Sequence, residues 1–193
     1  IDLYIFANTN DLRDAILYEP SWTGGQAFAD HDIVILGISQ SDLEWGRDAI
    51  VHELTHIFEF DIVPQSLLRE TVPLWVAEGL SDYMTGIWRP VDLMTVRDAA
   101  VTDNIPQMSR MEGYGQTSNP RLVYNLGHAA FEFIESKWGK EGLRQFLFSL
   151  RKGIVGGAES AYVEAFQLSG EEFDQQGRGL HAAALRCAAG SIG

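Results

Sequence analysis

The sequence predicts an α+β fold, with a small mixed sheet and helices in its N-terminal part and a helical lobe in its C-terminal part. Segments with the β-branched and aromatic content of strands lie near the N-terminus, and segments with helical periodicity follow them. This segregation along the chain is typical of α+β folds. The chain has 193 residues, of which 46% are hydrophobic, and this is enough for one core. We therefore expect a single domain over residues 1–193, with lobes at about 1–60 and 61–193.

The first expected elements are a strand and a short helix. Residues 1–7 are rich in β-branched and aromatic side chains, as strands are. Thr9 or Asn10 can cap the helix that follows by accepting hydrogen bonds from its first backbone N–H groups. We expect this helix to end at Pro20, because proline has no N–H group with which to continue it.

A β-hairpin is expected next. The pair Gly24-Gly25 breaks the preceding structure, and two short β-like runs follow at residues 26–29 and 32–38. A polar turn separates the two runs, which is the pattern of a hairpin. Together with the first strand, this hairpin forms the small mixed sheet.

Two longer helices follow the predicted sheet. Ser41 with Glu44 three residues later is a capping-box arrangement, and it opens a helix that carries the segment DAIVHELTHIFEF. A second helix is predicted over residues 70–85, with Pro73 near its first turn and Gly86 at its end. This helix carries the segment WVAEGLSDYM.

The rest of the chain is predicted to be mainly helical. Residues 101–120 are polar and contain glycine and proline, so we expect a loop near the functional cleft. Glycines then punctuate four helical patterns. These patterns lie at residues 121–138, 141–151, 157–168 and 170–187.

Charge and composition exclude several classes of function. The net charge is −13 with only 14 lysines and arginines, which disfavours binding to nucleic acid. No apolar run approaches the ~20 residues needed to span a bilayer. Cys187 is the single cysteine, so it forms neither an intramolecular disulfide nor a zinc–thiolate cluster. Because the chain begins inside an apparent strand, we expect it to be part of a longer, multidomain protein.

The segment HELTH carries the clearest chemical signal. His52 and His56 are four residues apart, so on a helix their rings lie on one face about one turn apart and can bind one ion. Glu53 is turned by ~100° from His52 and can contact a water molecule bound to that ion. A carboxylate in this position can take the proton from a zinc-activated water. The alternative is an ordinary amphipathic helix with two structural histidines.

A catalytic zinc site needs a third protein ligand. The metzincin pattern is excluded, because Glu59 and Ile62 stand where that pattern has glycine and histidine. Glu78 lies in an otherwise apolar helical segment, where a metal ion would offset the cost of burying its charge. Asp82 lies one turn later, where it can accept a hydrogen bond from a ligating histidine. The alternatives are a solvent-facing carboxylate for Glu78, and for Asp82 a surface charge or the third ligand itself.

HELTH followed by the helix segment EGLSD resembles the gluzincin metallopeptidases, the clan of thermolysin and the aminopeptidase N-like enzymes, and most resembles the bacterial peptidase MA-like domains. The resemblance implies a zincin-like active-site helix and Zn²⁺ as cofactor. It also implies that Glu78 is the third ligand and that Asp82 supports a zinc-binding histidine. The segment LVYNLG is similar to the Tyr-x-x-Gly segment of the aminopeptidases, which implies that Tyr124 stabilises the oxyanion and that Gly127 matches the glycine.

The chain departs from the aminopeptidases in two places. Their Gly-Ala-Met-Glu-Asn strand binds the free amine of the substrate, whereas the matching segment GGQAFA has no glutamate. We therefore expect an endopeptidase. The number of residues between His56 and Glu78 is also larger than in those enzymes, and residues 64–66 are expected to widen the intervening loop.

Three further residues have two interpretations each. His128 lies one turn after Tyr124 and can contact the substrate, but a lone histidine on a helix is often structural. Trp75 and Trp88 flank the segment of Glu78 and can either line a substrate pocket or belong to the core.

Two functions fit these observations. The first is zinc-dependent hydrolysis of a peptide or protein substrate, with Glu53 as the general base. The second is a zinc-binding accessory module of a larger envelope protein that cleaves nothing itself. The family resemblance leads us to expect an extracytoplasmic location in a bacterium.

Overall fold

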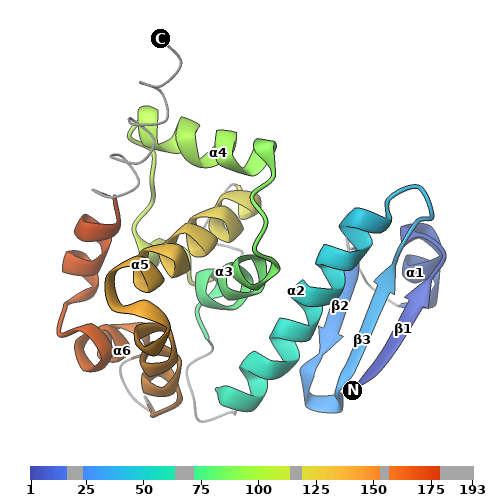
Figure 1. The fold of residues 1–193 in the computed structure, drawn as a ribbon, viewed down its shortest axis with the longest axis horizontal. Coiled ribbons are helices and arrows are strands. Elements are labelled where there is room, and N and C mark those ends of the chain that lie inside the picture. The colour runs from blue at the N-terminus through green and yellow to red at the C-terminus, as the bar shows by residue number, and fades with distance from the viewer. Residues whose placement is uncertain (17–23, 64–71, 114–118, 153–156, 179–193) are drawn as a thin grey trace. The chain divides into compact units, whose positions relative to one another are not determined.

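The computed structural model describes residues 1–16, 24–63, 72–113, 119–152 and 157–178. These residues form two compact units, Ile1–Asp61 and Ile62–Gly193. The first unit contains a three-stranded sheet, and the described part of the second is built from helices (Figure 1). The predicted α+β class is therefore confirmed. Within the described part of the chain, no helix has the length and apolar character needed to cross a membrane.

The sheet of the first unit is mixed, as the sequence predicted. Its strand order is β1-β3-β2, with β1 at Asp2–Phe6, β2 at Gly25–Phe28 and β3 at Ile33–Gly37. β1 runs parallel to β3, and β2 runs antiparallel to β3. The 3-10 turn η1 (Ala29–His31) joins β2 to β3, so the predicted hairpin is present.

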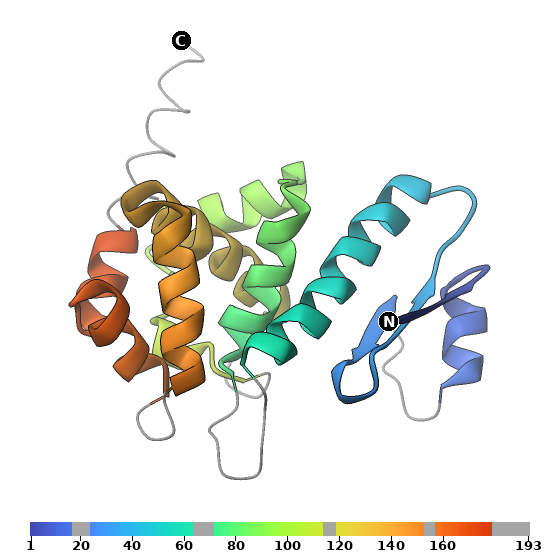
Figure 2. The same ribbon diagram turned by 60° about the horizontal axis from the view of Figure 1, so that its bottom comes forward.

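Helices pack on the sheet. Helix α2 (Leu43–Ile62) contributes Ile57 to an apolar cluster with Val34 and Leu36 of β3, all three fully buried. Helix α1 (Thr9–Ala15) lies on the side of the sheet away from α2 (Figures 1 and 2). Strand β3 therefore lies between two layers, and α2 is held against the sheet along its apolar stripe.

Both predicted helix caps were placed on the wrong residue. The side chain of Asn8, rather than Thr9 or Asn10, accepts hydrogen bonds from the backbone N–H groups at the start of α1. At the start of α2, Asp42 rather than Ser41 accepts the hydrogen bond from the N–H of Trp45, at 3.2 Å. In each case a neighbouring side chain with the same capping chemistry is better placed by the backbone. Pro20 lies outside the described residues.

The second unit contains the remaining helices. They are α3 (Leu74–Thr85), α4 (Pro90–Val101), the 3-10 turn η2 (Met108–Arg110), α5 (Pro120–Lys152) and α6 (Gly157–Phe166), and residues 170–178 are also helical. A break at Gly139, with φ of 67°, divides α5 into the two predicted helices. Helix α4 was not predicted. Outside the described residues lie the expected loop at 64–66, the predicted helix start at 70–71, and the end of the last predicted helix with Cys187.

Helix α3 begins later than predicted and ends where predicted. Pro73 occupies the N-cap position, so the helix starts at Leu74 rather than at residue 70. Gly86 ends it in the left-handed conformation with φ of 68°, which glycine adopts without steric cost.

Two glycines let α3 and α5 approach very closely. A Cβ atom at Gly79 would lie 2.4 Å from the Cα of Gly127, and a Cβ atom at Gly127 would lie 2.3 Å from the carbonyl oxygen of Trp75. Neither contact is possible for a residue with a side chain. Trp75 is 1% exposed and packs among the aromatic rings of this unit, so its interpretation as a core residue is confirmed.

Candidate metal centre

Helix α2 presents two histidine rings on one face. His52 and His56 are separated by one turn, and their ring centroids lie 5.0 Å apart in an edge-to-face arrangement. Both side chains are partly buried. The two rings therefore share one face of α2, as their spacing predicted, because a helix of 3.6 residues per turn brings residues i and i+4 together.

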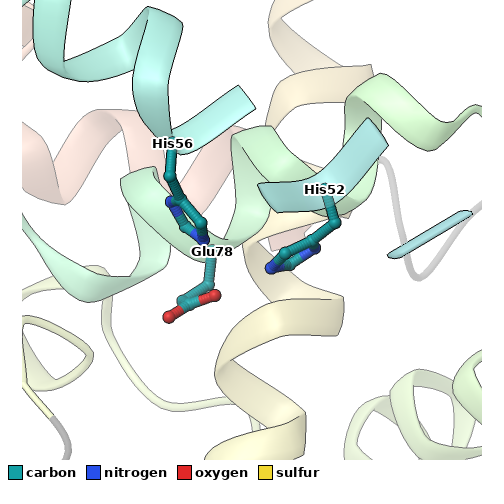
Figure 3. A group of neighbouring side chains, drawn as sticks. All are labelled: His52, His56 and Glu78. Atoms are coloured by element: carbon teal, nitrogen blue, oxygen red, sulfur yellow. The ribbon is translucent and has the colours of Figure 1, made fainter. Parts of the chain in front are cut away.

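Glu78 of helix α3 supplies a third ligand atom. One atom each of His52, His56 and Glu78 can be chosen so that all three lie within 4.8 Å of one another (Figure 3). Glu78 is 8% exposed, so its carboxylate is largely removed from water. Burying a carboxylate is costly unless hydrogen bonds or positive charge compensate it, and a bound cation would do so.

This donor set fits zinc. Two imidazole nitrogens and one carboxylate oxygen are the ligands of a common catalytic zinc site, which keeps a fourth position open. Bonds of about 2.0–2.1 Å in a tetrahedral site place the ligand atoms roughly 3.3 Å apart.

A buried carboxylate that the sequence analysis did not assign lies beside His56. An oxygen of Glu59 is 3.9 Å from Nδ1 of His56, and the side chain of Glu59 is only 5% exposed. A carboxylate on this side of the ring favours the tautomer that leaves Nε2 available as a metal ligand. The i,i+3 spacing on α2 was the signal that could have indicated this residue.

Glu53 projects from α2 toward strand β2. A Cβ atom built on Gly25 would lie 2.9 Å from Oε1 of Glu53 and 3.1 Å from its Cγ. The carboxylate of Glu53 therefore lies directly over the backbone of β2. Glu53 and Gly25 both belong to the first unit.

Asp82 is part of a charged cluster in the second unit. Arg121 donates two hydrogen bonds of 2.9 Å to Asp92 through Nε and Nη2, and its Nη2 lies 3.9 Å from an oxygen of Asp82. Asp92 is 5% exposed, so the guanidinium compensates a buried charge. Arg121 thus joins helices α3, α4 and α5 around Asp82.

Tyr124 lies one turn after Arg121 on α5. The guanidinium carbon of Arg121 is 5.7 Å from the centroid of the Tyr124 ring, within the range of a cation–π contact. The phenol ring therefore has a charged neighbour. Its proposed role toward substrate stays a prediction.

His128 is a buried residue of the second unit. It is 3% exposed, and its ring stacks on Trp88 with centroids 4.1 Å apart. The indole N–H of Trp88 donates a hydrogen bond of 2.8 Å to Glu132. Burial lowers the pKa of His128, and the negative charges of Glu132, Asp82 and Asp92 oppose this shift. The predicted contact between His128 and substrate remains untested.

Comparison with protein families identifies the family of this chain. The family model described as the peptidase MA superfamily matches residues 1–178, which include all of the residues above. A search of curated proteins finds no match.

Proposed function

Because this chain belongs to the peptidase MA superfamily, we propose that it is a zinc-dependent peptidase whose metal ligands are His52, His56 and Glu78. The observation that supports this proposal is the convergence of two imidazoles and one buried carboxylate within 4.8 Å. Such a set of ligands leaves room for water at the ion, as a hydrolytic site requires.

The residues of the chain divide the work of hydrolysis between them. When bound, zinc lowers the pKa of water and polarises a carbonyl oxygen. The carboxylate of Glu53 accepts the proton of the attacking water and then passes it to the leaving nitrogen. The phenol of Tyr124 donates a hydrogen bond to the carbonyl oxygen as negative charge develops there. Nothing in this scheme requires a covalent intermediate with the protein.

The proposed substrate is an extended internal segment of a peptide or protein. Strand β2 lies at an edge of the sheet, and an edge strand can pair with an extended peptide through backbone hydrogen bonds. The segment that includes β2 contains no carboxylate between Gly24 and Ala29 that could bind a free amino terminus. We therefore propose endopeptidase activity.

The proposal is tested with a library of quenched-fluorescent peptides whose termini are blocked. We expect the wild type to cleave a subset of them, and we expect Glu53→Gln to lose about 100-fold or more in kcat, as removal of a general base does. Tyr124→Phe should lose about 100-fold to 1,000-fold, because one oxyanion donor is removed.

Two outcomes would contradict the proposal. One is cleavage that is equally fast in the wild type and in Glu53→Gln, which would point to a contaminating protease. The other is a zinc-loaded wild type that cleaves none of the peptides, which would favour the zinc-binding accessory module.

A further inference from the structure

We propose that Gly25 is a positioning residue for Glu53, and that its lack of a side chain creates the space in which the catalytic carboxylate lies. The consequence for catalysis rests on the proposed function. The geometry does not, because it involves only β2, β3 and α2 of the first unit.

A side chain on Gly25 would meet two neighbouring side chains at very short distances. Gly25 pairs with Leu36 in the antiparallel ladder of β2 and β3. A Cβ atom on Gly25 would lie 2.5 Å from Cδ2 of Leu36 and 2.9 Å from Oε1 of Glu53. Real Cβ atoms essentially never show contacts under 3.0 Å, so at least one neighbour must move when a side chain is added.

Backbone conformation does not explain why this residue is glycine. Among the described glycines, those with positive φ are Gly86 and Gly139, and Gly25 is not one of them. Gly25 lies in a regular strand, where glycine is unfavourable because it loses more conformational entropy than other residues. A glycine inside a strand often marks a close approach by another group. Here two groups approach, the side chain of Leu36 from β3 and the carboxylate of Glu53 from α2.

A side chain at this position is expected to lower catalysis strongly and stability moderately. The atoms in the way are the ends of two flexible side chains, Leu36 and Glu53, which can rotate aside while the backbone stays in place. A general base, however, must stay within hydrogen-bond reach of the proton that it removes. Misplacement by about 1 Å costs roughly 100-fold in rate in other enzymes.

Gly24 provides a matched control. A Cβ atom on Gly24 would lie 2.7 Å from two ring atoms of Trp45 on α2. Gly24→Ala therefore creates a similar conflict with the same helix, one residue away, but against a side chain that has no proposed role in catalysis. The two variants displace different side chains of α2, and Gly25→Ala also meets Leu36 of β3.

The kinetic test compares Gly25→Ala with Gly24→Ala. We expect Gly25→Ala to lower kcat by roughly 10-fold to 100-fold, with KM and zinc content unchanged, and Gly24→Ala to keep the wild-type kcat. The double variant Gly25→Ala/Leu36→Val removes the conflict with Leu36 and should still have the low kcat. Recovery of kcat in the double variant, or an equal loss in Gly24→Ala, would overturn the proposal.

A second test does not depend on activity. The midpoint of urea unfolding is measured on metal-free protein. The loss caused by Gly25→Ala is determined once in the wild-type background and once in the Glu53→Ala background. We expect the loss to be smaller in the Glu53→Ala background, because the side chain that must move has been removed. Equal losses in both backgrounds would contradict the proposed contact, even if the protein were later shown to cleave no peptide. A failed proposal for Gly25 is thus distinguishable from a failed assignment of function.

Discussion

Glu59 is a buried residue that lies beside a proposed metal ligand. Its buried carboxylate lies 3.9 Å from Nδ1 of His56. We expect Glu59→Gln to weaken zinc affinity by about 10-fold to 100-fold, because the imidazole loses an anionic neighbour that orients it and increases its basicity. Competition with a chromophoric chelator measures the affinity. Glu44→Gln is the control, since Glu44 is an exposed carboxylate on the same helix. Equal affinities for the two variants would contradict this role.

The lowered pKa of His128 leads us to expect a pH dependence of stability. Burial lowers its pKa in the folded protein, against the opposing charges of Glu132, Asp82 and Asp92. As pH falls through the ordinary histidine pKa of ~6.5, the unfolded chain takes up the proton first. The free energy of unfolding therefore decreases as pH falls from ~6.5 to the lowered pKa of His128. Below that lowered pKa, protonation of His128 changes it no further. Tyr83 also faces this ring, and its pKa is raised by burial, so it does not titrate in this window.

The measurement is urea unfolding of metal-free wild type and His128→Asn between pH 8 and pH 5. Metal-free protein is used because zinc release is itself coupled to protonation of the ligands. We expect the wild type to lose more stability than His128→Asn over this range. Parallel pH profiles would show that His128 is protonated equally in the folded and unfolded states.

At the scale of whole elements, the crossing of α3 and α5 depends on backbone contact. A Cβ atom on Gly127 would lie 2.3 Å from the carbonyl oxygen of Trp75 and 2.7 Å from the Cα of Gly79, neither of which can rotate away. We expect Gly127→Ala to lower the free energy of unfolding by about 1–3 kcal/mol or more, because the two helices must separate. Gly113→Ala is the control, since its added methyl group would meet nothing within 4 Å. Equal stabilities of the two variants would contradict this packing.

Helix α4 is held to α5 by the ion pair of Asp92 and Arg121. Arg121→Gln would leave the carboxylate of Asp92 buried without its bidentate partner. We expect a loss of about 2–3 kcal/mol in stability, below the usual cost for a fully buried pair because the guanidinium is 48% exposed. Arg144→Gln, which breaks an exposed pair with Glu141, should change stability by less than ~1 kcal/mol. Thermal or urea unfolding that ranks the two variants in the opposite order would contradict the stabilising role of the Asp92–Arg121 ion pair.

Some predicted elements have a side-chain pattern that matches their burial, whereas strand β1 was predicted from its β-branched and aromatic content although Leu3, Tyr4 and Ile5 are exposed. Strand β3 and helix α2 have apolar residues on the faces that they bury. Helix α4 has a mixed pattern, because Val91, Met94 and Val101 are exposed while Asp92 is buried together with Val96 and Ala99. Its amphipathic pattern is therefore weak, and the hydrogen bonds from Arg121 to Asp92 help to explain which face is inward.

Over the whole molecule, the proposed site was predictable where its chemistry is local in sequence. The i,i+4 spacing of His52 and His56 determines their common face, and Glu78 was identified as a carboxylate in an apolar helix. The close approach of Glu53 to Gly25 and the ion pair of Arg121 with Asp92 were not predicted. Each depends on which element packs against it, and no local pattern encodes that.

Zinc content measured by elemental analysis tests directly whether His52, His56 and Glu78 form one metal centre. We expect about one zinc per chain in the wild type and in Glu53→Gln, and essentially none in His56→Ala or Glu78→Gln. Asp82→Asn should retain part of its zinc, because a supporting residue weakens binding without abolishing it. Wild-type zinc content in His56→Ala or Glu78→Gln would contradict the assigned ligands, and a wild type that binds no zinc would contradict the centre itself.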